Sequence, residues 1–164
     1  MVYMSKPLLI LENIRSSYNT WNMLRTADAL WWGVVLSGFT PDPLLSEKVS
    51  KTALGAEHTT IVYKNRNTTH VLSWLREQWL CILGSELTQS SRSVRLFSDD
   101  RKTLLESTSS VALIMWNEKT WLLQETRWLV NGLYHIPMIG IKESLNVWQA
   151  AAIMMWEINR VLWY

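Results

Sequence analysis

Residues 111–125 read Val-Ala-Leu-Ile-Met-Trp-Asn-Glu-Lys-Thr-Trp-Leu-Leu-Gln-Glu, and the choice between helix and hairpin in this stretch decides the fold. The apolar run that opens it ends at a turn-like Asn-Glu-Lys, after which the chain can return as a second strand. A single helix over 111–131 would place Glu118 and Glu125 within its main apolar arc, which disfavours that helix. We therefore predict that residues 93–125 form an antiparallel meander.

Helical and strand patterns surround the predicted meander. Hydrophobic residues at steps of three and four predict helices, and β-branched residues before a turn predict a strand. The predicted elements are helices over 18–38, 42–55, 68–84 and 144–164, and a strand over 58–64. No internal repeat and no long linker divides the chain. We expect an α+β fold, with N-terminal helices, an antiparallel sheet (the meander) and a long C-terminal helix, in a single domain of residues 1–164.

The predicted C-terminal helix has a wide apolar surface. On a helical projection, apolar side chains cover about two-thirds of its circumference, which is more than a surface helix needs. The helix is therefore either wrapped by the rest of the domain or has one face in the core and one against a partner. An amide within the apolar arc must find hydrogen bonds inside the fold or across an interface. The predicted partner contacts are Trp32, Met154, Trp156, Asn159 and Trp163.

Tryptophan dominates the aromatic composition, with 11 Trp against 2 Phe among 164 residues. Since each Trp buries roughly 150–250 Å², this set carries on the order of 2,000 Å² of mostly apolar surface. An interface of standard size needs about 800 Å² per partner. The surplus, together with the lack of a convergent polar site, predicts a non-enzymatic protein–protein interaction protein. It would act as a small adaptor, chaperone, inhibitor or accessory subunit of a larger intracellular assembly, or bind a second copy of itself.

Basic residues near predicted strand ends and turns support an alternative function. Lys and Arg side chains at such places can contact the phosphates of a nucleic acid. A solvated basic face would have the same composition, so the two interpretations remain open. The residues concerned are Lys64, Arg66, Arg92, Arg95, Arg101 and Lys102.

No residue constellation predicts catalysis, a cofactor or a metal site. Glu57, His58 and His70 would form an acid–base or metal site if they converged, but their spacing matches no zinc-binding pattern. Cys81 is the single cysteine and lies in an apolar run, where a small buried hydrophobe fits. We therefore expect no enzymatic activity, no cofactor and no bound metal.

Charge and hydropathy limit where the chain can act. The net charge of +2 is too small to steer the whole molecule onto a polyanion or an anionic membrane. The longest apolar stretch, residues 29–36, covers about a third of a membrane span. We expect a cytoplasmic protein without a membrane span.

Overall fold

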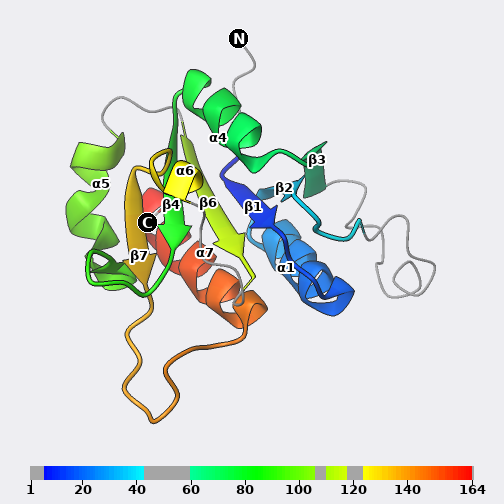
Figure 1. The fold of residues 1–164 in the computed structure, drawn as a ribbon. Coiled ribbons are helices and arrows are strands. Elements are labelled where there is room, and N and C mark those ends of the chain that lie inside the picture. The colour runs from blue at the N-terminus through cyan, green and yellow to red at the C-terminus, as the bar shows by residue number, and fades with distance from the viewer. Residues whose placement is uncertain (1–5, 43–59, 106–109, 118–123, 164) are drawn as a thin grey trace.

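The computed structural model describes residues 6–42, 60–105, 110–117 and 124–163. Within these ranges seven strands form one sheet in the order β3-β2-β1-β6-β4-β7-β5, and every neighbouring pair is parallel (Figure 1). The strands are β1 (Leu8–Glu12), β2 (Gly33–Ser37), β3 (Ile61–Asn65), β4 (Leu80–Ser85), β5 (Arg92–Ser93), β6 (Ser110–Trp116) and β7 (Gly132–His135). The helices are α1 (Ser17–Ala29), α4 (Thr68–Glu77), α5 (Phe97–Leu105), α6 (Gln124–Arg127) and α7 (Val147–Trp163), with a 3₁₀ turn, η2 (Val94–Leu96).

The sheet has a hydrophobic core on each face. Successive side chains of a strand point to opposite faces, and in β1 the alternate residues Leu9 and Leu11 join the core formed with α1 and α7. Leu8 and Ile10 join the second core, which packs against α4. The molecule is therefore a three-layer α/β structure, with α1 and α7 side by side on one face (Figure 1).

The predicted antiparallel meander is wrong. β6 lies between β1 and β4 and is parallel to both, with Leu113 paired to Leu9 on one side and Leu83 on the other. A strand that is covered on both faces reads as a continuous apolar run, and such a run contains no information on the direction of its neighbours. Residues 118–123, which were to form the returning strand, lie outside the described residues. The fold is therefore α/β and not α+β.

The segment before β6 also differs from the prediction. Instead of two strands and a turn, the chain forms η2 and then α5, which has Asp99 and Asp100 in its first turn. Acidic residues at this position interact favourably with the positive end of the helix dipole. The two adjacent acidic residues fit the start of a helix as well as they fit a turn.

Two predicted helices were too long. The helix predicted over 18–38 is α1 followed by β2, and the helix predicted over 68–84 is α4 followed by β4. Helices commonly end with a glycine in left-handed conformation, whereas here Trp31 and Trp79 hold the left-handed positions after α1 and α4. The expected end signal is therefore missing from the sequence.

The remaining predicted elements can be placed more briefly. β3 covers most of the predicted strand over 58–64, and the helix predicted over 42–55 lies almost entirely outside the described residues. α7 begins after Asn146, whose Oδ1 accepts a 3.2 Å hydrogen bond from the Trp148 amide, and not after Ser144 as predicted. No helix in the described ranges is long and apolar enough to cross a membrane.

Candidate functional site at the carboxyl edge of the sheet

The order of the strands marks one edge of the sheet as a place for a ligand. From β1 the chain continues through α1 to its neighbour β2, whereas β6 and β4 lie on the other side of β1. In parallel α/β sheets, ligands bind beyond the carboxyl ends of the strands where the strand order reverses. The loops that follow β1, β4, β6 and β7 all begin at this edge.

A cavity of about 110 Å³ lies beyond the ends of β4 and β7. Part of its wall comes from the long segment between β7 and α7, which projects beyond the sheet in Figure 1. The lining residues are Ser85, Glu86, Leu87, His135, Ile136, Met138, Glu143, Ser144, Leu145 and Ala150. The cavity thus combines apolar walls with carboxylate, imidazole and hydroxyl groups.

Glu86 is the buried acidic residue of this cavity. Its backbone amide donates to the Tyr134 carbonyl at 3.0 Å, and Arg127 Nη2 donates to Glu86 Oε2 at 2.6 Å. The Glu86 side chain is only 5% exposed, and within the described residues its other oxygen, Oε1, has no hydrogen-bond partner. A buried acceptor without a donor is costly. A ligand that supplies a hydrogen-bond donor at Oε1 would remove that cost.

His135 lies beside a hydroxyl group. Its Nδ1 is 3.0 Å from Ser91 Oγ, which is also 2.9 Å from the Thr88 carbonyl oxygen. A hydroxyl has one proton to give. When Ser91 donates it to Thr88, His135 Nδ1–H donates to Ser91 Oγ and the lone pair of the ring is on Nε2.

Tyr134 anchors the end of β7 beneath the cavity. Its hydroxyl donates to Asp100 Oδ2 at 2.7 Å, and Arg92 forms an ion pair with the same carboxylate. Burial raises the pKa of Tyr134, and the hydrogen bond to Asp100 raises it further. The tyrosine therefore remains a neutral donor that fixes β7 to α5.

A second hollow of about 420 Å³ lies beyond β2 and β3 at the same edge. Gly38 has a φ of +61°, and a Cβ at this position would lie 2.1 Å from Asn13 Oδ1, so only glycine fits. Asn13 Oδ1 also accepts a 2.9 Å hydrogen bond from the Phe39 amide, and the Phe39 side chain is 86% exposed. Lys64 and Arg66 line the hollow, and Lys64 pairs with Asp42.

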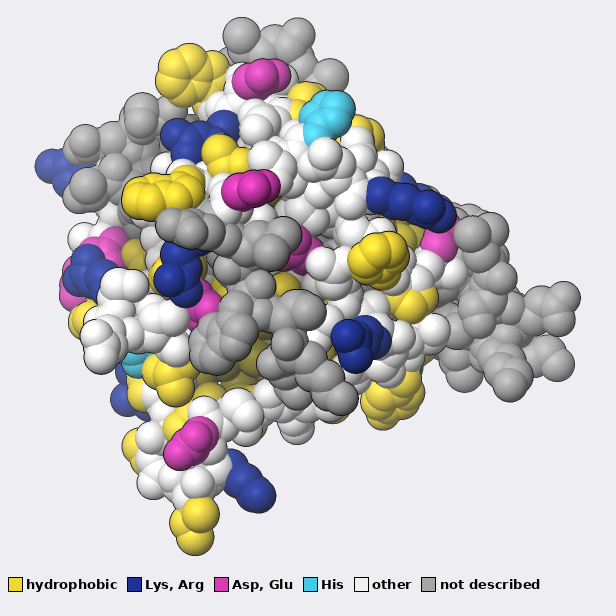
Figure 2. Space-filling view, viewed as in Figure 1, with side chains coloured by type: hydrophobic (Ala, Val, Ile, Leu, Met, Phe, Trp, Pro, Cys, Tyr) yellow, Lys and Arg dark blue, Asp and Glu magenta, His cyan; other side chains and the backbone are white. Residues whose placement is uncertain are grey.

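The six basic residues of the alternative prediction do not form one patch. Lys64 and Arg66 lie at the β3 edge of the sheet, and Arg92, Arg95, Arg101 and Lys102 lie in β5, η2 and α5 near the opposite edge. Arg92 pairs with Asp100, while Arg95 and Lys102 are exposed. Figure 2 shows Lys and Arg side chains separated from one another over the visible face.

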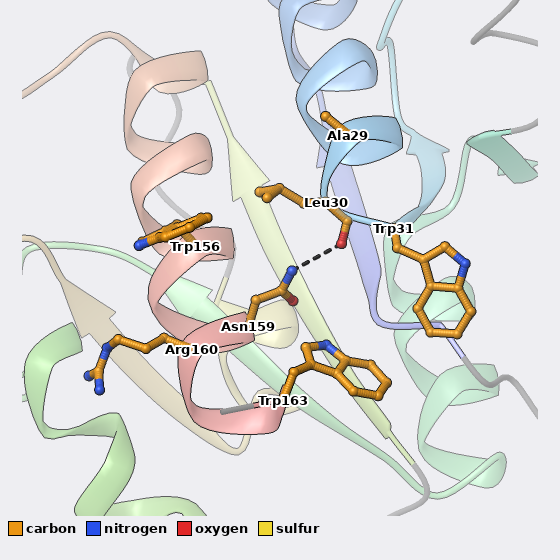
Figure 3. A pocket seen from close by; sticks show the side chains of 7 residues that line it. All are labelled: Ala29, Leu30, Trp31, Trp156, Asn159, Arg160 and Trp163. Atoms are coloured by element: carbon orange, nitrogen blue, oxygen red, sulfur yellow. Dashed lines mark hydrogen bonds between the residues drawn. The ribbon is translucent and has the colours of Figure 1, made fainter.

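The predicted partner contacts divide between core and surface. Trp32 and Met154 are 1% and 0% exposed, so they belong to the core and cannot contact a partner. Asn159 accepts from Trp32 Nε1 at 2.8 Å and donates to the Leu30 carbonyl at 3.0 Å, so its amide is satisfied within the fold. Trp156 and Trp163 are more than half exposed and line a cavity of about 350 Å³ between α1 and α7 (Figure 3).

The remaining sequence candidates do not form a site. Glu57 and His58 lie outside the described residues, and His70 is exposed on α4. Among the described residues no group of His, Cys, Asp and Glu is arranged to hold a metal ion. Cys81 is buried, and this burial raises the pKa of its thiol to about 12, so it lacks the thiolate that reactive cysteines use.

Known proteins resemble this chain over almost its whole length. Residues 6–156 match the SpoU rRNA Methylase family. The chain belongs to this family. The 23S rRNA (guanosine-2'-O-)-methyltransferase RlmB of Neisseria meningitidis serogroup B is 31% identical over 153 residues, which are 93% of this chain and 58% of that protein. The tRNA (guanosine(18)-2'-O)-methyltransferase of Thermus thermophilus is 26% identical over 153 residues, or 93% of this chain and 73% of that protein.

Solved structures agree with the sequence match. An AdoMet-bound rRNA methyltransferase from Sinorhizobium meliloti is 29% identical, with a TM-score of 0.78, and the match covers 97% of this chain and 57% of that one. This chain therefore spans little more than half the length of that protein and of the Neisseria relative.

Membership of the SpoU family corrects the functional prediction. The interpretation as a non-enzymatic adaptor, chaperone, inhibitor or accessory subunit is wrong, because the family consists of RNA-modifying enzymes. Among the described tryptophans only Trp21 and Trp32 are buried, at 6% and 1% exposure, whereas Trp31, Trp79, Trp128, Trp156 and Trp163 are exposed. Exposed tryptophan by itself therefore does not identify a non-enzymatic binding protein. The relatives named above are rRNA and tRNA methyltransferases, and RNA belongs to the ligand class of the alternative prediction, nucleic-acid binding. The basic residues named for it stay a prediction.

Sequence reasoning did not single out Glu86, and it interpreted His135 as a loop histidine whose ring is satisfied by backbone groups. The stretch 85–93 is rich in Ser, Thr and Gln, a composition that is typical of a surface loop. The available signal was the position of this stretch directly after the apolar run 80–83, because polar residues that follow a buried parallel strand lie at its carboxyl end.

Proposed function

We propose that this chain is the methyl-transferring domain of an RNA 2′-O-methyltransferase that uses AdoMet. The observation that carries the proposal is the family match over residues 6–156, and the names of the rRNA and tRNA methyltransferase relatives support the choice of reaction. AdoMet replaces the sequence-based expectation that no cofactor is needed. An RNA substrate also agrees with the predicted cytoplasmic location, which stays a prediction.

The cavity beyond β4 and β7 has suitable chemistry for this cofactor. AdoMet has an ammonium group and ribose hydroxyls, all of which donate hydrogen bonds, and Glu86 Oε1 is a buried acceptor without a donor among the described residues. The volume of about 110 Å³ is below the 300–1,000 Å³ of typical small-molecule sites, so the described cavity takes only part of the ligand. Glu86 would hold that part, and Arg127 keeps Glu86 in place.

The bound cofactor would supply an electrophilic methyl group, and the protein must orient the RNA and take up the proton of the ribose hydroxyl. A lone pair on His135 Nε2 can accept that proton, since a positioned imidazole is a common general base. A hydrogen bond from His135 Nδ1–H to Ser91 Oγ would leave Nε2 free for this role. The exposed ring of Phe39, with Lys64 and Arg66 beside it, offers a stacking surface and two cations for the RNA at the same edge.

Transfer of labelled methyl groups tests the proposal directly. Purified protein is incubated with methyl-labelled AdoMet and either rRNA or tRNA, and the modified nucleosides are analysed for 2′-O-methylation. We expect label in the ribose of one RNA class, and a higher KM for AdoMet in Glu86→Gln. In Glu77→Gln, which changes an exposed carboxylate on α4, activity should be unchanged. Absence of ribose methylation on both RNAs, in protein that binds AdoMet, would refute the reaction.

We also propose that the surface around the cavity between α1 and α7 binds a second copy of this chain. Three large apolar side chains are exposed there: Ile153 at 39%, Trp156 at 58% and Trp163 at 53%. Such a cluster is typical of an interface core. The same patch on two copies can pair about a two-fold axis. Trp156→Lys should turn a dimer into a monomer in sedimentation analysis. A monomeric parent protein at micromolar concentration would contradict this part of the proposal.

A further inference from the structure

Two tryptophans adopt a backbone conformation that suits glycine. Trp31 and Trp79 have φ angles of +63° and +62°. In this left-handed region the Cβ of an L-residue crowds the following carbonyl oxygen, and bulky residues are rarely found there. Each tryptophan therefore holds a position where its own side chain is unfavourable.

The hydrogen bonds around Trp31 define the position more closely. The Trp31 amide donates to the Asp28 carbonyl at 3.1 Å, and the Trp32 amide donates to the Ala27 carbonyl at 2.8 Å. Together these are the two bonds of the Schellman motif, whose left-handed residue is usually glycine. The backbone at residue 31 thus forms a complete glycine-type helix end.

Trp79 holds the corresponding position at the end of α4 and forms one of the two Schellman bonds. Its amide donates to the Arg76 carbonyl at 2.9 Å, and the preceding Gln78 closes the last helical turn. β4 begins at the next residue, as β2 begins two residues after Trp31. Two α–β connections of the same domain therefore have tryptophan at the position of the glycine.

The other left-handed residues of the described chain are of the usual types. They are Gly38, with a φ of +61°, and Asn13, with a φ of +52°. Asparagine tolerates this region much better than aromatic residues do. The exceptions are therefore confined to Trp31 and Trp79.

Neither indole is buried in the core. Trp79 is 63% exposed, and Trp31, which touches Trp163 edge-on at 5.6 Å and has Lys6 Nζ 5.5 Å from its ring centroid, is 46% exposed. The chain also contains more Trp than Gly, 11 against 6. An average composition would give about 11 glycines for this length. An excess of tryptophan and a deficit of glycine are expected if tryptophan stands at some glycine positions, which is also what the two φ angles indicate.

We propose that residues 31 and 79 are encoded by UGA codons and are glycine in the protein as its own organism makes it. UGA is a stop signal in the standard genetic code, but some codes assign it to tryptophan and others to glycine. If the codon is UGA, translation with a tryptophan code gives the tryptophan in the sequence, and translation with a glycine code gives the residue that the backbone requires. The inference is independent of the proposed methyltransferase activity, since it rests on backbone geometry and composition.

The codons and the native peptides test the proposal first. We expect UGA at positions 31 and 79 of the gene, and, in protein isolated from the source organism, peptides whose masses require glycine at both positions. A UGG codon at either position would overturn the proposal, and so would a native peptide that contains tryptophan there.

A pair of substitutions at two sites tests the structural argument. At position 79, Trp79→Gly and Trp79→Ala both remove the indole and differ only in Cβ, so the glycine variant should have a folding equilibrium constant about tenfold higher than the alanine variant. Trp156, 58% exposed within α7, is the matched control. There the order should reverse, with Trp156→Ala about fivefold more stable than Trp156→Gly. An alanine variant as stable as the glycine variant at position 79 would show that the site does not require glycine.

Discussion

Asn159 should be one of the most sensitive polar residues of the domain. It lies on α7 and connects that helix to the end of α1. It accepts from Trp32 Nε1 at 2.8 Å, and it donates to the Leu30 carbonyl at 3.0 Å, the bond drawn in Figure 3. The Trp32 side chain is 1% exposed, so its indole N–H depends on Asn159 for an acceptor within the fold. The perturbation that we consider is Asn159→Ala.

The expected cost follows from the groups that are left behind. Truncation leaves the Trp32 indole N–H without an acceptor and the Leu30 carbonyl without its side-chain donor. Each buried group without a partner costs about 1–3 kcal/mol. Leu30 is half-buried and can recover part of its loss from water. We therefore expect Asn159→Ala to lower the free energy of unfolding by about 2–4 kcal/mol.

Urea denaturation followed by circular dichroism measures this change in the free energy of unfolding. A double-mutant cycle shows how much of it comes from the hydrogen bond between Asn159 and Trp32. In a Trp32→Phe background the indole donor is absent, so Asn159→Ala should cost about 1–2 kcal/mol less than in the parent protein. Asn22→Ala is the control, because Asn22 Nδ2 donates to the Tyr18 carbonyl on the surface of α1, and its cost should stay within about 0.5 kcal/mol. Additive costs in the cycle, or an Asn159→Ala effect no larger than the control, would refute the argument.

Further predictions concern a buried acid, the RNA surface and a glycine. Burial raises the pKa of Glu12 despite a hydrogen bond from Thr68, so its contribution to stability is full below about 4.5 and is lost as the pH rises through the higher folded value. Glu12→Gln should therefore stabilise the protein at pH 7 but not at pH 4, as thermal unfolding at the two pH values would show. Equal stabilisation by Glu12→Gln at both pH values would contradict this prediction. Replacing Lys64 and Arg66 together with Gln should reduce the salt dependence of RNA binding by about two phosphate contacts, whereas an unchanged slope in a filter-binding titration would place the RNA elsewhere. Gly38→Ala should lower the free energy of unfolding by at least about 1 kcal/mol, because its Cβ would lie 2.1 Å from Asn13 Oδ1; a neutral result by urea denaturation would show that the turn can move.

The sequence predicted several elements but not their arrangement. The apolar run of β6 and the wide apolar surface of α7 were recognised, because each is long and strongly patterned. The direction of β6 could not be read, since a strand buried on both faces has no polar face to orient it. The ends of α1 and α4 were missed because the usual glycine is not written in the sequence at these places.

The site was harder to predict than the fold. Glu86 is buried only because Arg127, 41 residues further along the chain, and the end of β7 lie against it. His135 Nδ1 pairs with the hydroxyl of Ser91, which is 44 residues earlier. Neither relationship has a spacing that a motif could express, so the site emerges only when the parallel strands are in order.

The central place of β6 also affects how the chain can be made. β1 pairs with β6 through residues such as Leu9 and Leu113, which are about a hundred residues apart. At a synthesis rate of about 5–20 residues per second, a ribosome needs on the order of 5–20 seconds to cover that distance. During this time β1 can pair with β2 but keeps its other edge open, and open strand edges invite association with other chains. The nascent chain is therefore an expected client of ribosome-associated chaperones until residue 116 has emerged.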